Sequence, residues 1–149
     1  MNKLLKLREI TQEDWEILLE WRNDIVTRQN SFNSDLISIS EHKDYINKTI
    51  INPNRTQFIL EYNQNPVGTI REDKLGDDEI ELSYTVSPHC RGMKIGQIMM
   101  GIYLMERSGS FLCGVKEENI PSIKMIEKLG FKFFKKEGGV NFYRLVKSN

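Results

Sequence analysis

The order of strand-like and helix-like segments is the feature that most constrains the fold of this chain. Alternating or β-rich stretches predict strands at residues 4–9, 57–62, 67–72, 79–86, 110–115, 131–137 and 140–146. Apolar residues at helical spacing predict helices at residues 11–24, 38–51, 95–108 and 121–130. The resulting order, β-α-α-β-β-β-α-β-α-β-β, predicts a mixed α/β domain in which helices cover both faces of one sheet.

Local signals mark where some of these segments begin and end. Thr11 is placed to cap the first helix, and acidic residues follow it in the first turn. Residues 63–66, which read NQNP, stand between two strands and predict a hairpin. On the second helix we expect Tyr45, Ile46 and Ile50 to form the apolar side.

The bulk composition favours a globular domain and argues against several kinds of partner. The chain has 149 residues, 39% of them hydrophobic and 28% charged, which suits a single domain over residues 1–149. Basic and acidic residues balance at 21 each, whereas a general nucleic-acid binder usually has a basic surplus. No stretch approaches the roughly 20 apolar residues of a membrane helix. We therefore expect neither nucleic acid nor a membrane as a partner.

The cysteines and histidines predict neither a disulfide framework nor a metal site. Cys90 and Cys113 are not spaced as a CxxC pair, and the start of the chain lacks the features of a signal peptide. We expect both thiols to be reduced and the protein to be cytoplasmic. His89 stands beside Cys90, but no further His or Cys lies at ligand spacing, so we expect no metal.

The junction between the strand at 79–86 and the next helix is the strongest candidate for a ligand site. It reads VSPHCRGMKIG over residues 86–96, with Arg91 and Lys94 as cations and two glycines that allow close backbone approach. A helix start presents unpaired N–H groups and the positive end of the helix dipole, which bind anions such as phosphate. On the motif alone, an ordinary turn with two solvated cations accounts for these residues equally well.

This junction resembles the acetyl-CoA pyrophosphate loop of the GNAT family of N-acetyltransferases, whose pattern is Gln/Arg-x-x-Gly-x-Gly/Ala. Arg91 and Gly96 match the pattern, whereas Lys94 stands where the family usually has its middle glycine. A second family segment lies downstream at the expected distance. It is matched by Asn119, Ser122, Glu127, Lys128, Gly130 and Phe131. The order of elements also resembles the family over essentially the whole chain.

The resemblance implies a single GNAT-like domain, with a mixed, mostly antiparallel sheet of about seven strands and helices on both faces. Acetyl-CoA would be the co-substrate, with its pantetheine arm between the strands at 79–86 and 110–115. The residues that the resemblance implies for this site are Val86, Arg91, Gly92, Met93, Lys94, Ile95, Gly96, Asn119, Ser122 and Lys128. The Val86 N–H would hold the thioester carbonyl. We expect Lys94 to keep a negative φ, because a positive φ costs a non-glycine residue roughly 1–2 kcal/mol.

The resemblance also implies direct attack of an amine on the thioester, which is helped by a base and an acid. Glu79 and Glu81 share one face of their strand, and Glu81 is our choice of base because it is nearer the expected divergence. The alternative, a solvent-facing acidic strand end, accounts better for Glu79 than for Glu81. The usual acid of the family is a tyrosine at the position of Ile126. The remaining hydroxyl candidates are Ser122, Tyr84 and Tyr143.

The first two helices would line the acceptor side. Residues 20–24 and 40–46 resemble the branches that act on nucleotide-linked amino sugars, as in the pseudaminic acid pathway, and on ribosomal-protein N-termini. The residues that we expect on this side are Trp21, Arg22, Asn23, His42, Glu79 and Glu81. Trp21 would stack on a ring and Arg22 would pair with a diphosphate. The alternative places Trp21 in the core and Arg22 on the surface, and makes His42 a structural residue.

We therefore predict an acetyl-CoA-dependent N-acetyltransferase that acetylates a primary amine on a nucleotide-linked amino sugar. One alternative is an acetyltransferase for a protein N-terminus or a polyamine, and another is a non-catalytic acetyl-CoA-binding module. An acidic acceptor groove would favour a polyamine, and a basic aromatic groove would favour the sugar nucleotide. The expected partners are a small-molecule amine and a second copy of the chain in a homodimer.

Overall fold

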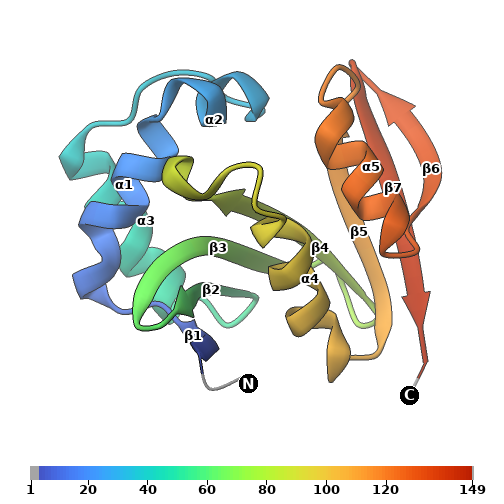
Figure 1. Cartoon of the computed structure of the whole chain (residues 1–149), viewed down its shortest axis with the longest axis horizontal. Helices are drawn as coiled ribbons and strands as arrows, with labels where there is room; N and C mark the ends of the chain where they lie inside the picture. Colours follow the sequence, from blue (N-terminus) through green and yellow to red (C-terminus); the bar gives the residue numbers. More distant parts are fainter. Residues whose placement is uncertain (1–3, 149) are drawn as a thin grey trace.

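The computed structural model describes residues 4–148 and contains a seven-stranded sheet flanked by helices (Figure 1). The strands are β1 Leu5–Glu9, β2 Arg55–Tyr62, β3 Asn65–Lys74, β4 Glu79–Val86, β5 Gly109–Lys116, β6 Lys132–Glu137 and β7 Val140–Lys147. The helices are α1 Trp15–Asn23, α2 Ile25–Asn30, α3 Ile39–Ile51, α4 Ile95–Met105 and α5 Ile120–Lys128. Short 3-10 helices, Gln12–Asp14 and Pro88–Cys90, stand before α1 and α4.

The strands lie in the order β1-β2-β3-β4-β5-β7-β6, and β4–β5 is the parallel pair in a sheet that is otherwise antiparallel over the described residues. The mixed, mostly antiparallel sheet and the order of its elements are thus confirmed. One helix was not predicted from the sequence. Asp24 ends α1 with a ψ of 137°, and its side chain then accepts a hydrogen bond from Thr27 N (3.1 Å) at the start of α2.

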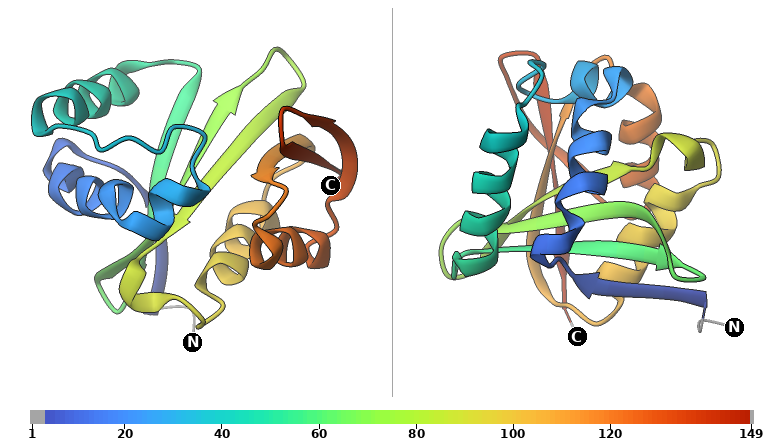
Figure 2. Two further views of the ribbon diagram at one scale, coloured as in Figure 1. Left: turned by 90° about the horizontal axis from the view of Figure 1, so that it is seen from above. Right: turned by 90° about the vertical axis from the view of Figure 1, so that its left-hand side faces the viewer.

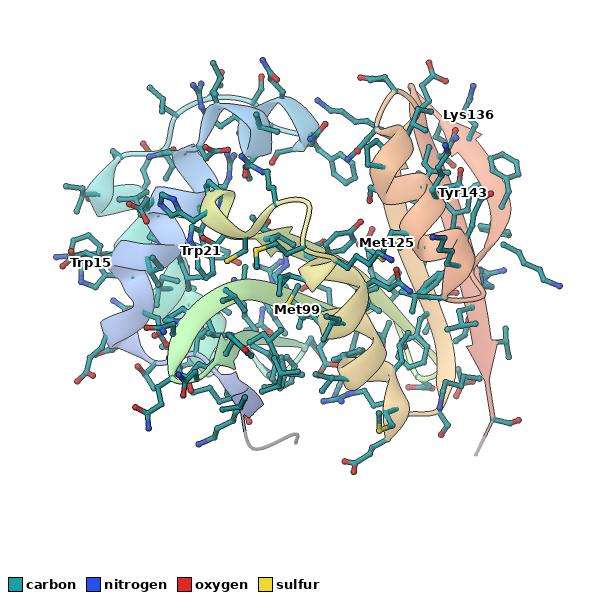
Figure 3. The ribbon with its side chains drawn as sticks, viewed as in Figure 1. Trp15, Trp21, Met99, Met125, Lys136 and Tyr143 are labelled. Carbon is teal, nitrogen blue, oxygen red and sulfur yellow. The ribbon has the colours of Figure 1, made fainter. Side chains whose placement is uncertain are left out.

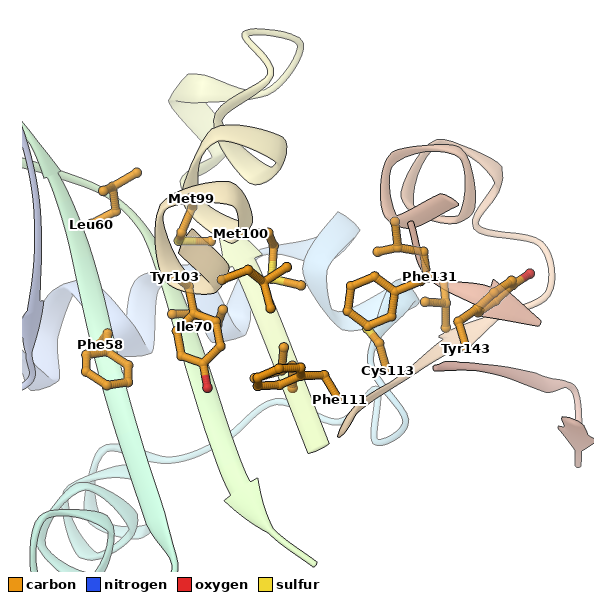
Figure 4. Packing of buried hydrophobic residues seen from close by; sticks show 14 of the residues in the cluster. Phe58, Leu60, Ile70, Met99, Met100, Tyr103, Phe111, Cys113, Phe131 and Tyr143 are labelled. Atoms are coloured by element: carbon orange, nitrogen blue, oxygen red, sulfur yellow. The ribbon is translucent and has the colours of Figure 1, made fainter. Parts of the chain in front are cut away.

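The helices cover both faces of the sheet (Figure 2). On one face, α1 and α3 bring Trp21 and Ile46 against Ile59 of β2. On the other face, α4 and α5 cover the larger cluster in Figure 4. That cluster includes Phe58, Leu60, Ile70, Leu82, Met99, Tyr103 and Ile126. Strand residues contribute to both clusters because successive side chains of a strand point to opposite faces of the sheet. Over residues 4–148, no helix combines the length and apolar character needed to span a membrane.

Two local predictions have different outcomes. The hairpin at 63–66 is confirmed, since β2 and β3 are joined by Asn63 and Gln64 with φ of 51° and 71°, as in a type I′ turn. The buried side of α3 was predicted wrongly at Ile50, which is 43% exposed while Thr49 is buried. His42, Ile46 and Thr49 form the buried stripe of α3, so Ile50 falls beyond its edge.

Candidate active site

β4 and β5 pair over their first halves and then diverge (Figure 1). Glu79–Leu82 pairs with Ser110–Cys113, although β4 continues to Val86 and β5 to Lys116. Beyond that point β4 stays paired with β3, and β5 stays paired with β7. The two halves of the sheet therefore separate beyond Leu82 and Cys113, between the strands that were expected to diverge, and we call this divergence the cleft.

The N–H groups of Tyr84 and Val86 point into this cleft. In an antiparallel pair, alternate residues direct their N–H groups toward and away from the partner strand. Ser87 N donates to Val67 O (2.9 Å), so the facing residues Val86 and Gly68 are a pair that exchanges no hydrogen bonds. Val86 N–H therefore points away from β3, and Tyr84, two residues earlier, does the same. β4 thus presents backbone donors where its pairing with β5 has ended.

The loop after β4 brings the N-terminus of α4 to the cleft. Lys94 caps α4 in the left-handed region, with φ 60° and ψ 22°. Our prediction of a negative φ at this position was wrong, because the loop keeps the conformation that the family's glycine would allow. Ligand-binding loops often hold such strain against a cost of about 1–3 kcal/mol. Ile98 N donates to Lys94 O (3.0 Å), so the N–H groups of residues 95–97 have no acceptor within the turn of α4.

Gly96 lies where β4, α4 and α5 meet. A Cβ built on Gly96 would stand 3.5 Å from Val86 Cγ2, 3.6 Å from Met125 Cε and 3.7 Å from Tyr84 Cε2. Met125 comes from α5 and points toward α4 (Figure 3). One methyl group is accommodated at these distances, whereas a branched side chain would enter the cleft. Gly96 thus lies within contact distance of β4 and α5, where a larger side chain would meet both.

Arg91 is held by α2 and does not project freely from the loop. Its Nη2 binds the carboxylate of Asp24 and Thr27 Oγ1 (3.1 Å). The hydrogen bond from Arg91 lowers the pKa of the Asp24 carboxyl. From the far side of the cleft, Lys116 Nζ donates to Gln29 O (2.8 Å). α2 therefore links the loop before α4 to the C-terminal end of β5, and so bridges the two diverging strands.

α5 brings a hydroxyl pair to the cleft. Asn119 caps α5 by accepting a hydrogen bond from Ser122 N (3.4 Å). The Ser122 hydroxyl bonds the hydroxyl of Tyr84, whose pKa is raised by burial. Ile126, at the family's tyrosine position, is buried in the core, and Tyr143 is buried on β7. Of the hydroxyl candidates, Tyr84 and Ser122 are the two that meet beside the cleft.

The other predicted cofactor residues lie on the loop before α4 and on α4 and α5. Gly92 has a φ of 80°, a conformation that glycine adopts readily. Met93 is exposed on the loop, and Ile95 is half-buried at the start of α4. Lys128 is exposed in the last turn of α5. Their roles toward acetyl-CoA stay predictions.

A pocket of about 300 Å³ lies on the face of β4 that α1 and α3 cover. It is lined by Leu18, Trp21, Arg22, Ile37, His42, Tyr45, Gln57, Thr69, Arg71, Ser83, Tyr84 and Thr85. These residues include two arginines and no carboxylate. A second hollow, of about 350 Å³, lies over β6 and β7 and shares none of these residues. The structure thus brings three predicted acceptor residues, Trp21, Arg22 and His42, into one pocket.

The sheet wall of the pocket, formed by Tyr45, Gln57, Thr69 and Arg71, is a closed hydrogen-bond network. Tyr45 Oη donates to Gln57 Oε1 (2.7 Å), and Gln57 Nε2 donates to Thr69 Oγ1 (2.9 Å). Arg71 donates to Tyr45 Oη (3.3 Å) and pairs with Asp73 (2.9 Å). Each of these polar side chains therefore has a protein partner.

The helix wall is formed by Trp21 and Arg22 of α1 and His42 of α3, and each of them has a polar atom without a hydrogen-bond partner in the described part of the chain. Its buried atoms Trp21 Nε1, Arg22 Nη1 and His42 Nε2 have no hydrogen-bond partner among residues 4–148. The other terminal nitrogen of Arg22, Nη2, donates to Asn33 O (2.8 Å). Trp21 is 1% exposed and points inward from α1 (Figure 3), as the core alternative expected. Burial lowers the pKa of His42, which favours a neutral ring.

Asn23 positions a loop instead of facing the pocket. Its Nδ2 donates to Ile37 O (2.9 Å), and its Oδ1 accepts from Ile37 N (2.9 Å). Arg28 supports the same loop by donating to Ser34 O (3.3 Å). The side-chain amide of Asn23 is used at both ends and does not line the pocket, so its predicted contact with the acceptor has no support in this geometry.

The two carboxylates of β4 have different surroundings. Glu79 Oε2 binds Arg144 Nε (2.9 Å) and Ser110 Oγ (3.0 Å), and the bond from Arg144 lowers the pKa of Glu79. Glu81 lies on the same face, two residues nearer the divergence, and its carboxylate takes part in no ion pair within the described part of the chain. Glu79 is thus held by Arg144 and Ser110, whereas Glu81 has no such ion pair among the described residues, and the predicted roles of both stay predictions.

The described residues offer no group of three His, Cys, Asp or Glu side chains placed to hold a metal ion. Both cysteines are free thiols. Cys113 is buried in the core, and burial raises its pKa to about 12. Cys90 is half-buried on the loop after β4.

Comparisons with known proteins agree with the motifs. The model of the acetyltransferase (GNAT) family matches residues 6–131. A domain from Methanocaldococcus jannaschii is 25% identical over 95% of this chain and 97% of its own, with a TM-score of 0.82. Campylobacter jejuni N-acetyltransferase PseH is 17% identical over 97% and 99%, with a TM-score of 0.75. Vibrio cholerae spermidine N-acetyltransferase, solved with CoA and spermine, is 17% identical over 98% and 97%, with a TM-score of 0.84.

Proposed function

This chain belongs to the GNAT family of acetyltransferases, and we propose that it moves the acetyl group of acetyl-CoA to the primary amine of an anionic small molecule. The observation that carries the proposal is that β4 borders both sites. The N–H groups of Tyr84 and Val86 face the cleft, while Ser83 and Thr85 line the pocket. A thioester held in the cleft and an amine held in the pocket would meet across this one strand.

The cleft fits acetyl-CoA, which supplies an activated acetyl thioester when it is bound. The N–H groups of residues 95–97 would bind the pyrophosphate at the start of α4. The pantetheine arm would pass Gly96 between β4 and α5, where the absence of a larger side chain keeps Val86 and Met125 free of a clash. Val86 N–H would donate to the thioester carbonyl, where negative charge develops during transfer. Asn119 and Lys128 would contact the pantetheine and the 3′-phosphate.

Glu81 is the base in this proposal, directly or through a water. It would take the proton from the acceptor's ammonium group, and unlike Glu79 it is not engaged by an arginine. Tyr84, supported by Ser122, would give a proton to the departing sulfur. Burial raises the pKa of Tyr84, so the hydroxyl keeps its proton at neutral pH. A general acid contributes typically ~10²–10⁴-fold, which Ile126 cannot supply at the family's tyrosine position.

A nucleotide-linked amino sugar is our first candidate acceptor. Its diphosphate is anionic, and the pocket contains Arg22 and Arg71 without a carboxylate. A polyamine would need the opposite charge in the pocket. The spermidine N-acetyltransferase from Vibrio cholerae shares the fold, but its acceptor does not fit the charge of this pocket.

We also propose a cytoplasmic homodimer. The free thiols of Cys90 and Cys113 suit a reducing compartment. β6 is exposed along its whole length and forms an edge of the sheet with Phe133 and Phe134. Exposed edge strands readily pair with another chain. Light scattering that gives twice the mass of the chain supports the dimer, and the mass of one chain contradicts it.

Two measurements test the proposed function together. Calorimetry reports whether acetyl-CoA binds, and a thiol-release assay reports whether an amine accepts the acetyl group. We expect saturable binding and thiol release with at least one anionic primary amine. Binding without release for any sugar nucleotide, amino acid, polyamine or peptide would indicate a non-catalytic binding module. Absence of acetyl-CoA binding would contradict the proposal at its first step.

A further inference from the structure

The helix wall of the pocket differs from the sheet wall in that each of its three residues has a buried polar atom without a hydrogen-bond partner in the described chain. Trp21 is 1% exposed and His42 is 3% exposed, and each has a buried polar atom without a hydrogen bond in the described chain. Arg22 adds a buried guanidinium nitrogen in the same state. Buried polar groups are normally paired, and an unpaired one destabilises the fold. All three residues line one pocket, so a ligand that enters the pocket is the natural partner.

Two of the three groups can only donate. The indole N–H of Trp21 and the guanidinium of Arg22 have no acceptor atom, and an arginine stays charged in proteins. His42 differs, because burial lowers its pKa and favours the neutral ring, which has one nitrogen that accepts and one that donates. Its unpartnered Nε2 is the nitrogen that we assign as the acceptor. The wall thus offers one cation, one neutral donor and one acceptor.

The local charge favours an anion at the two donors. Arg71, the other arginine of the pocket, is already paired with Asp73. Burial has the largest effect on the pKa of Arg22 and lowers it. Of the charged neighbours, Arg28 also lowers the pKa of Arg22, and Asp35 raises it. No carboxylate lines the pocket, so the charge of Arg22 is not neutralised there.

We propose that Trp21 and Arg22 bind an anionic group of the acceptor, a carboxylate or a phosphate, and that His42 Nε2 accepts a hydrogen bond from a hydroxyl or amine beside it. The inference rests on the proposed function, because the same pocket is taken to hold the acceptor. The anion anchors the acceptor at α1, and its amine then extends toward Ser83 and Thr85 on β4.

The pocket volume limits what lies behind that anion. About 300 Å³ is the lower end of the range for small-molecule sites and suits a group of the size of an amino acid or a single sugar. A nucleotide attached to the phosphate would exceed this volume and would have to extend out of the pocket. A carboxylate acceptor would instead be enclosed whole. The shared chemistry is an anion at Trp21 and Arg22, and the tests separate its two sources.

The first test observes Trp21 directly, with acetyl-CoA present. The chain has two tryptophans, so the indole N–H region of a nitrogen-15 NMR spectrum contains two signals. Trp15 does not line the pocket and serves as an internal control. Sodium acetate and inorganic phosphate are the probes, and sodium chloride controls for ionic strength. We expect a saturable shift of the Trp21 signal alone, which Arg22→Gln abolishes. Equal shifts of both signals, or none, overturn the inference.

The second test uses pairs of amines that differ in one anionic group. One pair is an amino acid and its amide, and the other is a nucleotide-linked amino sugar and the free amino sugar. We expect the anionic member of one pair to be preferred, with Arg22→Gln raising KM for it roughly 10- to 100-fold, the value of a charge-assisted hydrogen bond. Preference within the first pair identifies a carboxylate, and preference within the second identifies a phosphate.

Arg28→Gln is the matched control. Arg22 and Arg28 both donate to backbone oxygens of residues 33–34, but Arg28 does not line the pocket. We expect Arg28→Gln to change KM for the anionic amine by less than about threefold. Equal use of charged and uncharged amines, or an equal effect of both variants, overturns the inference while acetyl transfer continues. A wild-type protein that does not bind acetyl-CoA would overturn the proposed function instead.

Discussion

The two sides of β4 are built from different parts of the polypeptide. The cleft side presents backbone donors, from Tyr84 and Val86 and from residues 95–97 at the start of α4. The pocket side presents side chains, above all the unpartnered Trp21, Arg22 and His42. A backbone site depends on side chains mainly for the room that they leave. A side-chain site depends on the chemical identity of each residue.

Lys94 illustrates the first kind of site. The family usually has a glycine here, yet the loop keeps a φ of 60° with a lysine. The Ser87–Val67 bond on one side and the first turn of α4 on the other hold the loop in place. The position of the backbone therefore survives a change of residue that local propensity argues against. Steric changes should thus damage the cleft, and chemical changes should damage the pocket.

The largest effect is expected from filling the cleft. Gly96→Val should weaken acetyl-CoA binding at least about 100-fold, because the branched side chain would enter the space between Val86 and Met125. Gly101→Val is the control, since Gly101 lies in the same helix and a Cβ there meets nothing within 4 Å. Titration calorimetry on both variants measures the difference. Equal affinities would place acetyl-CoA elsewhere.

The next effect concerns the chemistry on the pocket side. Glu81→Gln should lower kcat at pH 7 by roughly 10²–10³-fold, and less at high pH, where the free amine is abundant. Glu79→Gln should leave kcat within about threefold but lower the melting temperature. That loss of stability should be present at neutral pH and disappear in acid, as pH falls through the lowered pKa of Glu79. Matching pH–rate profiles for Glu81→Gln and the wild type would remove Glu81 as the base.

A smaller effect is expected at the hydroxyl pair. Tyr84→Phe should reduce kcat about 10- to 100-fold with little change in KM for acetyl-CoA, because the leaving sulfur loses its proton donor. Tyr143→Phe removes a buried tyrosine hydroxyl on β7 and should leave kcat nearly unchanged. Steady-state kinetics with both variants decides the matter. If Tyr143→Phe slows turnover as much as Tyr84→Phe, the hydroxyl at Tyr84 has no special role.

The smallest effect is expected at Lys94. Lys94→Gly should raise the free energy of unfolding by about 0.5–1 kcal/mol, since glycine relieves the left-handed strain but loses more chain entropy on folding. Lys94→Ala keeps the strain and should not gain stability. Both variants should bind acetyl-CoA within about threefold of the wild type, as measured by calorimetry. A common tenfold loss would show that the ammonium of Lys94 pairs with a phosphate.

Much of the fold was determined by the sequence, because hydrophobic period and turn residues act over a few positions. Alternation predicted the strands, and Asn63-Gln64 produced the predicted hairpin. α2 was missed because none of its residues, Ile25–Asn30, is buried, so no apolar stripe at helical spacing marks this helix. Ile50 was misplaced because the choice between Thr49 and Ile50 depends on how α3 rotates against β2, which the helix's own pattern leaves open.

The proposed cofactor side was located for the same reason, since a glycine-bearing turn between a strand and a helix is a local feature of residues 86–96. Trp21, Arg22 and His42 were also named from the sequence, but only tertiary structure decided which of them are unsatisfied. It also decided that Asn23 holds Ile37, that Glu79 is engaged by Arg144, and that Arg91 is bound to Asp24. These partners lie 14, 65 and 67 positions apart along the chain. A local pattern specifies where a charged or polar side chain stands, whereas its partner is set by the packing of distant segments.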